Sequence, residues 1–291
     1  VLMKIGIVCY ATFGGSGILA TELGKALADK GHRVHFITSN MPPRLYKGYS
    51  KNIFYHQVDQ LEYPLFKNQP YTLSLANKIN EVYKNEGLDV LHVHYAIPHA
   101  TSAYLAKQMR LPDKMPIVTT LHGTDITLVG KDPSFYDITR FSINSSTVVT
   151  AVSNYLRDVT IEIFKPDIEV QTLYNFVDTD LFTVKNYHKT CDATVFLHYS
   201  NFRKVKRSVD AVKAFIEIHK QCKKTRLLLA GEGPLITECH ALVKEHNLCD
   251  VVDFLGNQED IVSIIQLADV ILCPSEQESF GLVAIEAMSC G

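Results

Sequence analysis

Two glutamates near the end of the chain, Glu278 and Glu286, are spaced in a way that could bind a phosphorylated sugar. Seven residues separate them, and Gly281 lies between them. The apolar residues 270–273 predict a strand that leads into this loop, and a helix is predicted from Phe280 onward. Backbone N–H groups at a helix N-terminus attract an anion, and carboxylates on either side could bind hydroxyls, as a sugar nucleotide requires. Alternatively, both glutamates are exposed side chains without a ligand, as most acidic residues are.

A glycine-rich loop, residues 11–17, follows the first apolar run of the chain. Residues 15–20 match the dinucleotide pattern G-x-G-x-x-A. That pattern also requires an acidic residue at the end of the second strand, where this chain has Thr38, Ser39 and Asn40. The missing acid argues against NAD. The glycines still indicate either a substrate that approaches the backbone closely or a tight turn without a ligand.

A histidine loop, residues 121–125, follows the apolar run 116–120. His122 could bind a sugar hydroxyl, with Asp125 orienting its ring. Alternatively, Thr124 or Asp125 caps a following helix and His122 is structural. His92, His94 and His99 lie nearby in the sequence, but no carboxylate or thiol completes a metal-ligand spacing. We therefore expect no metal site here.

Four cations lie together in residues 200–207, after a predicted strand: Arg203, Lys204, Lys206 and Arg207. Because the net charge of the chain is −2, this cluster is its best candidate for phosphate binding. The alternative is an exposed helix start with solvated charges. Two further loops, 230–234 and 254–258, also follow predicted strands and expose backbone groups.

The elements that must position these loops form two series of alternating strands and helices. The first series has strands at 4–9, 32–38, 89–94, 116–120 and 147–151 and helices at 18–30, 71–85, 99–109 and 154–164. The second has strands at 194–199, 226–230, 251–255 and 269–273 and helices at 208–220, 235–246 and 260–267. Runs rich in Val, Ile and Leu are typical of parallel strands covered on both faces. We predict two Rossmann-like, doubly wound α/β domains, 1–175 and 176–291.

The composition is that of an ordinary soluble protein, with 46% hydrophobic and 21% charged residues. The small net charge favours neither nucleic-acid nor membrane-surface binding. No run of apolar residues predicts a membrane span. The seven cysteines show no C-x-x-C pair, which indicates reduced thiols and a cytoplasmic protein. We also expect the second domain to be incomplete at its C-terminus, since its sheet normally needs further strands.

The loops described above occur in this order in family 4 glycosyltransferases of the GT-B fold, which the chain resembles over nearly its whole length. The resemblance includes residues 14–17, 122–123, 151–153, 174–178, 203–207 and 231–234, together with the glutamate pair. It implies two domains that face a cleft, the first for the acceptor and the second for a nucleotide sugar, and a retaining transferase that needs no cofactor or metal. Residues 21–24, 35–39, 121–127 and 200–207 resemble members that transfer N-acetylglucosamine from UDP-N-acetylglucosamine to L-malate.

The resemblance also implies roles for single residues. On the donor side, Glu278 would hold the sugar hydroxyls and Glu286 the ribose, while Arg203 and Lys206 would neutralise the departing UDP. Backbone groups at Ser279, Phe280, Gly281 and Leu282 would receive the diphosphate, and Asn257 would meet the uracil. His122 would contact the transferred sugar, and Gly15 would lie against the donor phosphate. Acceptor candidates are Ser16, Tyr95, Thr124 and Asn154, with Arg44 as a further cation.

Two other interpretations of this resemblance stay open. The chain could be a family 4 glycosyltransferase with a sugar or lipid acceptor. It could also be a truncated module that binds a nucleotide sugar without turnover. The sequence does not define the oligomeric state and leaves a homo-oligomer open.

Overall fold

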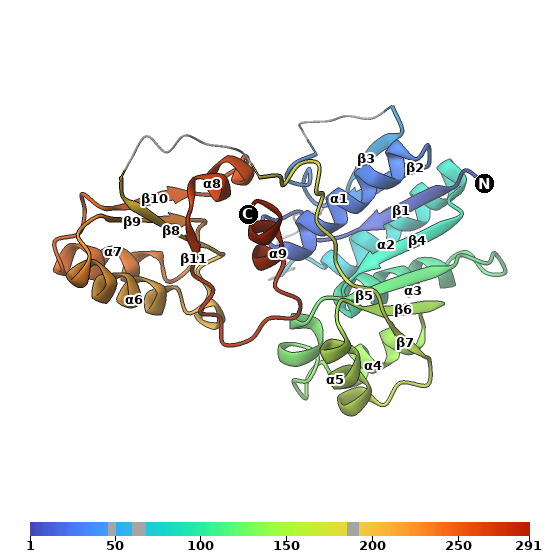
Figure 1. Ribbon diagram of the computed structural model, residues 1–291. Coiled ribbons are helices and arrows are strands. Elements are labelled where there is room, and N and C mark those ends of the chain that lie inside the picture. The colour runs from blue at the N-terminus through green and yellow to red at the C-terminus, as the bar shows by residue number, and fades with distance from the viewer. Residues whose placement is uncertain (46–50, 60–67, 185–191) are drawn as a thin grey trace. The chain divides into compact units, whose positions relative to one another are not determined.

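The computed structural model describes residues 1–45, 51–59, 68–184 and 192–291. The chain divides into two compact units, Val1–Asn175 and Phe176–Gly291. Each unit has its own sheet with helices packed on both faces (Figure 1).

The first unit is built on a seven-stranded parallel sheet with the order β3-β2-β1-β4-β5-β6-β7. Its strands are β1 (Lys4–Val8), β2 (Arg33–Thr38), β3 (Ile53–Gln57), β4 (Val90–His94), β5 (Ile117–Leu121), β6 (Val148–Ala151) and β7 (Val170–Thr172). Its α-helices are α1 (Gly15–Asp29), α2 (Tyr71–Val82), α3 (Thr101–Gln108), α4 (Tyr136–Asn144) and α5 (Asn154–Phe164). Its described residues also form the short π-helical turns η1 (Tyr83–Gly87), η2 (Ala96–Ala100) and η3 (Thr124–Leu128).

Helices bury both faces of this first sheet. On one face, Ala20 and Ala28 of α1 pack with Ile7 and Phe36. On the other, α2 and α3 pack against residues such as Ile37, which follows Phe36 in β2. Neighbouring side chains of one strand therefore enter different cores, which explains the continuous apolar runs in the sequence.

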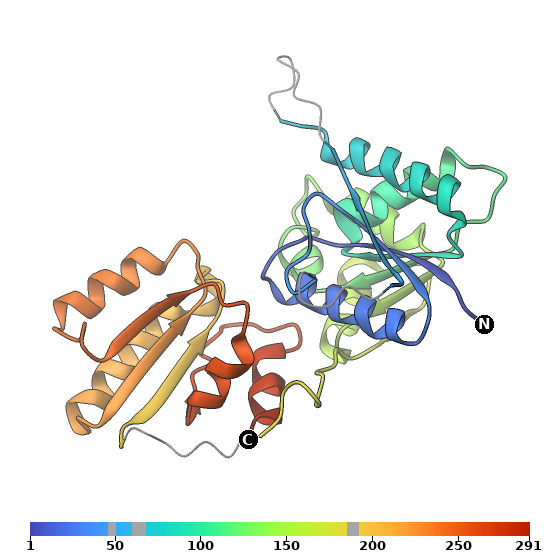
Figure 2. The ribbon, with the colours of Figure 1, turned by 90° about the horizontal axis from the view of Figure 1, so that it is seen from above.

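The second unit has a four-stranded parallel sheet with the order β10-β9-β8-β11. Its strands are β8 (Thr194–Tyr199), β9 (Thr225–Ala230), β10 (Val252–Gly256) and β11 (Val270–Ile271). Its helices are α6 (Ser208–Gln221), α7 (Ile236–Glu245), α8 (Ile261–Leu267) and α9 (Leu282–Ser289), with a 3-10 turn η4 (Lys204–Lys206). Two buried clusters lie on opposite faces of the sheet, one with α6 and α7 and the other with α8 and α9. Figure 2 shows the helices on either side of these strands.

The predicted α/β class with parallel sheets is confirmed in both units. The structure corrects two details near the glutamate pair. The strand expected at 270–273 is only β11, and the helix expected from Phe280 begins at Leu282. Strands β3 and β7 and helix α4 were not predicted from the sequence.

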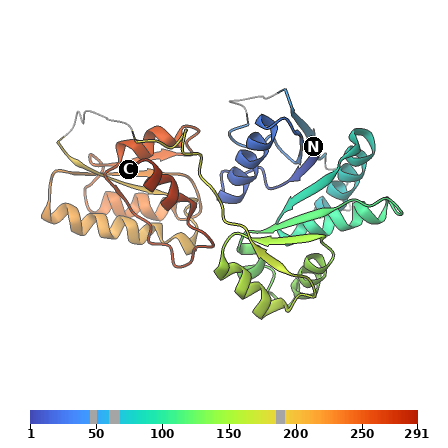
Figure 3. The same cartoon turned by 45° about the vertical axis from the view of Figure 1, so that its right-hand side comes forward.

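The strand order reverses once in each sheet, between β1 and β4 in the first unit and between β8 and β11 in the second. In parallel α/β sheets, ligands bind beyond the carboxyl ends of the strands at such a reversal. The loops after β1 and β4 and those after β8 and β11 leave the sheets at these two positions, and they carry Ser16, Tyr95, Lys206 and Glu278 among the candidate residues. Figure 3 shows the two sheets from another side.

Within the described ranges, no helix combines the length and apolar character needed to cross a bilayer. The cysteines found in these ranges are free thiols. Cys191, which the sequence also predicts to be reduced, lies outside the described residues.

Candidate functional site

The glycine-rich loop after β1 folds tightly onto its own backbone. Gly14 is the N-cap of α1, and the Gly17 N–H donates to the Gly14 carbonyl at 3.0 Å. A Cβ on Gly17 would lie 2.4 Å from the carbonyl oxygen of Tyr10 and 2.6 Å from that of Thr12. The turn itself thus requires this glycine, as in the tight-turn interpretation. Gly15, in contrast, is exposed at the start of α1, where a ligand could reach its backbone.

Two of the predicted acceptor residues, Ser16 and Tyr95, meet across the strand reversal of the first sheet. Ser16 follows β1 and Tyr95 follows β4, and the Ser16 Oγ lies 2.8 Å from the Tyr95 hydroxyl. Tyr95 has a φ of 84°, an uncommon conformation for a residue with a side chain. Its ring contacts Tyr10 and His122 at centroid distances of 5.4 and 5.2 Å. The pair presents two hydroxyls that can exchange hydrogen bonds with a ligand.

The loop after β5 is organised by Asp125, but not in the way expected. Its carboxylate accepts hydrogen bonds from three backbone N–H groups, those of Ala96 at 2.9 Å, His122 at 3.1 Å and Gly123 at 3.0 Å. The expectation that Asp125 orients the His122 ring is therefore wrong. Burial raises the pKa of Asp125 to about 6, although these backbone bonds oppose the shift. Asp125 joins the loop after β4 to the loop after β5, and thereby fixes the backbone of His122.

The His122 ring is oriented by another histidine. His122 Nε2 lies 2.8 Å from His94 Nδ1, and the two rings stack at 5.1 Å. His94 in turn stacks on His92 at 4.5 Å. Desolvation, followed by the nearby rings of His92 and His99, lowers the pKa of His122 to about 3. His122 is therefore neutral near pH 7 and can exchange a hydrogen bond with a sugar, but it cannot neutralise a phosphate.

The remaining acceptor candidates follow the next two strands of the same sheet. Thr124 opens η3 after β5, and Asn154 opens α5 after β6. Because β1, β4, β5 and β6 are adjacent and parallel, Ser16, Tyr95, Thr124 and Asn154 all lie at one edge. Arg44 is different, because its Nη1 lies 4.0 Å from the carboxylate of Glu22.

In the second unit, the predicted cation and the predicted sugar-binding carboxylate meet at the other strand reversal. Lys206 in η4 donates to Glu278, with an Nζ–Oε1 distance of 2.6 Å. The two loops are also joined through their backbones, because the Glu276 N–H donates to the Val205 carbonyl at 2.9 Å. The four predicted cations differ in their surroundings. Arg207 pairs with Asp210 at 2.7 Å, whereas Arg203 is exposed beside η4.

A buried histidine connects the ends of the two strands, β8 and β11, that carry these loops. His198 in β8 contacts the Leu272 carbonyl through Nδ1 and the hydroxyls of Ser200 and Ser208 through Nε2, each at 2.9 Å. It thus ties the end of β8 to the chain after β11. The loop after β9 packs directly above: a Cβ on Gly231, where φ is 114°, would lie 1.9 Å from the Ser200 carbonyl oxygen. That glycine is needed for close packing of the loops.

Asn257, predicted to meet the uracil, follows β10 and is exposed. Its Nδ2 donates to Glu232 Oε2 at 3.0 Å. Glu232 comes from the loop after β9 and was not predicted as a site residue, although it lies in the glycine-rich turn 230–234. This hydrogen bond joins the loops after β9 and β10, whose backbone groups lie at the carboxyl edge of the sheet.

Glu286 is only 3% exposed, so the interpretation of this residue as an ordinary surface glutamate is wrong. It lies one turn inside α9, whose N-cap is Gly281. Gly281 has a φ of 85°, and a Cβ there would meet no atom within 4 Å. The half-buried residues Ser279, Phe280 and Leu282 surround this helix start. The structure thus places a helix N-terminus beside open space, directly after Glu278.

Comparison with known proteins identifies two family models that match successive parts of the chain. Residues 13–181 match the model of Glycosyltransferase Family 4, and residues 183–291 match that of Glycosyl transferases group 1. The chain is 49% identical over 296 aligned residues to N-acetyl-alpha-D-glucosaminyl L-malate synthase of Bacillus anthracis, covering 99% of this chain and 77% of that protein.

Solved glycosyltransferases share the fold. A glycosyltransferase from Rickettsia africae has a TM-score of 0.73 at 23% identity, covering 99% of this chain and 77% of that one. HepE from Anabaena, solved in complex with UDP and glucose, has a TM-score of 0.75 at 19% identity, with coverage of 99% and 78%. These similarities confirm the predicted GT-B fold class. Since a family model spans more than half of the chain and a relative shares almost half of its residues, the chain belongs to glycosyltransferase family 4.

Proposed function

We propose that this glycosyltransferase transfers N-acetylglucosamine from UDP-N-acetylglucosamine to the hydroxyl of L-malate. The observation that carries the proposal is the 49% identity, over 99% of the chain, to a protein named for that product. Polar residues at both strand reversals support it, because each unit offers groups suited to one of the two substrates.

The second unit would bind the donor. Lys206 and Arg203 carry the charge that a diphosphate needs, and the N–H groups at the start of α9 add partial positive charge. Glu278 would accept hydrogen bonds from hydroxyls of the sugar, and Glu286 from the ribose. The backbone near Asn257 would bind the uracil. HepE, which shares this fold, was solved with UDP and glucose, and this supports a UDP-sugar as the donor.

The chemical step would break the bond between the anomeric carbon and the phosphate oxygen. The malate hydroxyl oxygen forms the new bond to that carbon, from the face that the diphosphate leaves, so the configuration is retained. The hydroxyl proton passes to an oxygen of the departing UDP. Negative charge grows on the diphosphate as the bond breaks, so Lys206, Arg203 and the α9 N–H groups stabilise the transition state.

The first unit would bind the acceptor. Malate carries two carboxylates, for which Ser16, Tyr95, Thr124 and Asn154 offer hydroxyl or amide donors. His122 is neutral because its pKa is low, and it would exchange a hydrogen bond with the transferred sugar.

The test is release of UDP from UDP-N-acetylglucosamine in the presence of L-malate. Succinate is a matched control acceptor, because it has both carboxylates but no hydroxyl to attack the sugar. We expect UDP release and a glycosylated product with L-malate and only background hydrolysis with succinate. Turnover with a sugar or lipid acceptor but not with malate would overturn the acceptor assignment and leave the donor assignment intact.

A further inference from the structure

Three side chains that the proposed reaction does not use converge at the β3 edge of the first sheet. His35 comes from β2, His56 from the edge strand β3 and Glu86 from η1. In the register of the two strands, His35 is opposite Phe54 and Ile37 is opposite His56. The two histidines therefore share one face, the face that also buries Ile37 against α2.

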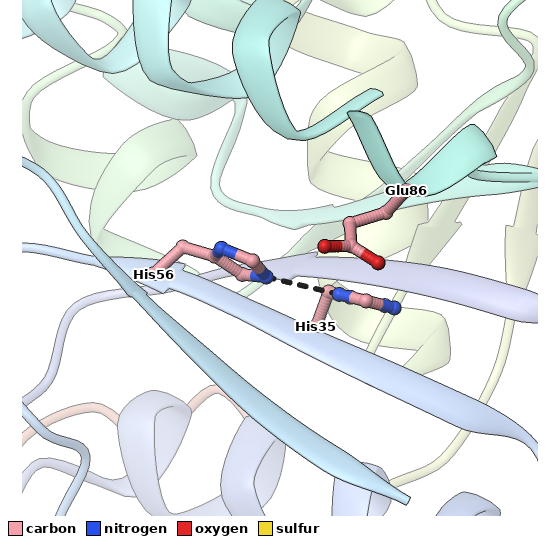
Figure 4. A group of neighbouring side chains, drawn as sticks. All are labelled: His35, His56 and Glu86. Carbon is pink, nitrogen blue, oxygen red and sulfur yellow. Dashed lines mark hydrogen bonds between the residues drawn. The ribbon is translucent and has the colours of Figure 1, made fainter. Parts of the chain in front are cut away.

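The potential ligand atoms of these residues are close enough to share one ion. One ligand atom from each residue lies within 4.8 Å of the other two. His35 Nδ1 and His56 Nε2 are 2.9 Å apart. Figure 4 shows the two rings edge to edge in neighbouring strands, with the Glu86 carboxylate above them.

His35 has an unmet hydrogen-bonding group in this arrangement. Its side chain is fully buried, and its Nε2 has no hydrogen-bond partner among the described residues. The ring is stacked on Phe54 at 4.7 Å, so it cannot turn toward solvent. A neutral imidazole has one donor and one acceptor, and here only one nitrogen is used. The nitrogen that faces His56 is Nδ1, so Nδ1 is the atom that would bind an ion, and Nε2 would stay without a partner among the described residues.

The protonation states suit metal binding. Burial is the main cause that lowers the pKa of His35 to about 4, with His56 next, and burial also lowers the pKa of His56. Both rings are thus neutral near pH 7 and keep a lone pair for a metal.

Both acidic and basic groups surround the two histidine rings, so the local charge favours a bound metal cation only moderately. The carboxylate of Glu86 lies 3.5 Å from Arg33 Nη2, a loose contact that leaves it free to turn. Lys4 Nζ donates to the Glu86 backbone carbonyl at 2.7 Å. Lys78 and Glu81 also act on His56, with opposite signs.

The ligand set selects the class of metal. Two imidazoles and one carboxylate suit Zn²⁺ and similar late transition metals, whereas Ca²⁺ and Mg²⁺ prefer oxygen ligands. Tetrahedral Zn²⁺ with Zn–N bonds of about 2.0–2.1 Å separates its ligand nitrogens by about 3.3 Å. The two histidine nitrogens would therefore move apart by a few tenths of an ångström. His56 and Glu86 are partly exposed, which gives the ion access and leaves its fourth position to water.

We propose that His35, His56 and Glu86 form a binding site for one Zn²⁺ ion, which ties the edge strand β3 to β2 and to η1. The ion replaces the hydrogen bond between the two histidines. Its role is structural, because it adds a link from β3 to β2 and η1 beside the strand pairing with β2 and the packing of Ile53 and Tyr55 in the core with α1. The site is independent of the proposed transfer reaction.

The test is titration of the metal-free protein with Zn²⁺ by calorimetry, and with Co²⁺ by absorption spectroscopy. We expect one ion per chain, a melting temperature that rises with Zn²⁺ and returns with EDTA, and a Co²⁺ spectrum without a thiolate charge-transfer band. The spectrum matters because Cys222, Cys249 and Cys273 are exposed thiols that could also bind zinc.

The variants His56→Gln and Glu86→Gln should each weaken Zn²⁺ binding by about tenfold or more. Both positions are partly exposed, and circular dichroism of the metal-free variants checks that they fold. His246→Gln, which changes an exposed histidine at the end of α7, should bind Zn²⁺ like the unchanged protein. Absence of stoichiometric binding, or equal binding by folded His56→Gln and Glu86→Gln, would overturn the proposal.

Discussion

Lys206 and Glu278 form an ion pair at the strand reversal of the second sheet, with 2.6 Å between Nζ and Oε1. Their side chains are 21% and 41% exposed, and such pairs contribute only about 0.2–1 kcal/mol to stability. The pair is therefore weak enough to open when a diphosphate arrives. In the proposed function, Lys206 would turn to the phosphates and Glu278 to the sugar. Donor binding would thus replace the ion pair with two contacts to the donor.

This pair predicts opposite effects of Glu278→Gln on UDP and on the complete donor. Without its carboxylate partner, Lys206 is available to the phosphates. The affinity for UDP should therefore rise by about two- to fivefold, which corresponds to the free energy of one exposed ion pair. Turnover of UDP-N-acetylglucosamine should fall by about tenfold or more, because charge-assisted bonds to the sugar are lost. Calorimetry and initial rates measure the two effects. Glu276→Gln, an exposed acid in the same loop, is the control, and weaker UDP binding by Glu278→Gln would contradict this account.

Lys206→Ala should remove the cation that is proposed to bind the diphosphate. We expect the affinity for UDP to fall by about tenfold or more, the equivalent of one charge-assisted hydrogen bond. Lys204→Ala removes the same charge from an exposed position in the same turn η4 and should change the affinity much less. Equal losses in the two variants would mean that only the general charge of the loop matters.

Glu286→Gln should weaken binding of UDP but not of pyrophosphate, which has no ribose. The glutamine keeps the volume of this buried side chain and removes the acceptor strength of its carboxylate. Lys206→Ala should weaken both ligands, so the two variants separate ribose contacts from phosphate contacts. Competition calorimetry with both ligands measures this difference. Unchanged UDP affinity in folded Glu286→Gln would reject the ribose role.

Much of the fold could be predicted from the sequence, because strands buried on both faces are continuous apolar runs. Helix α5 and strand β8 begin and end where expected. Strand β3 was not predicted, because it lies at the edge of the sheet and its polar residues His56 and Gln57 interrupt the apolar run. Strand β7 has only three residues, too few for a pattern.

The candidate site could be predicted one residue at a time but not as a set of contacts. Lys206 and Glu278 were both expected to bind the donor, yet their contact depends on β8 lying next to β11. For Asp125, the sequence could not distinguish a carboxylate that faces a ring from one that binds backbone N–H groups. His35 and His56 escaped notice because no short spacing joins them to Glu86.

The buried histidines of the first unit predict that it loses stability in mild acid. Burial lowers the pKa of His35, His92 and His99 to about 4 and that of His122 to about 3. Between about pH 6.5 and 4, the unfolded chain binds these protons and the folded chain does not, so stability falls as the pH falls. Asp125, with its pKa raised to about 6, acts in the opposite direction by about one proton.

These four histidines less Asp125 give a difference of about three protons, or about 4 kcal/mol per pH unit near pH 5. His94, whose pKa burial lowers well below its usual range, adds to this difference. Hydrogen exchange of amides in β4 and β5 at several pH values measures this slope locally. His92→Gln should reduce the slope by about one proton. Stability that stays constant between pH 6.5 and 4.5 would contradict the lowered pKa values of these histidines.

The Ser16–Tyr95 contact predicts a selective effect on the acceptor. Tyr95→Phe removes the hydroxyl that lies 2.8 Å from Ser16 Oγ and keeps the ring packed on His122. We expect the KM for L-malate to rise by about five- to tenfold, the equivalent of one hydrogen bond of about 1 kcal/mol or slightly more. UDP affinity should stay unchanged. Tyr104→Phe, on α3, is the matched control.

Ser16→Ala should raise the KM for malate as well, and the double variant shows whether the two hydroxyls act together. If they bind the acceptor as a connected pair, the combined effect on KM will be smaller than the product of the single effects. Independent effects would mean that each hydroxyl meets the acceptor separately. A fall in UDP affinity with unchanged malate KM would instead assign the pair to the donor.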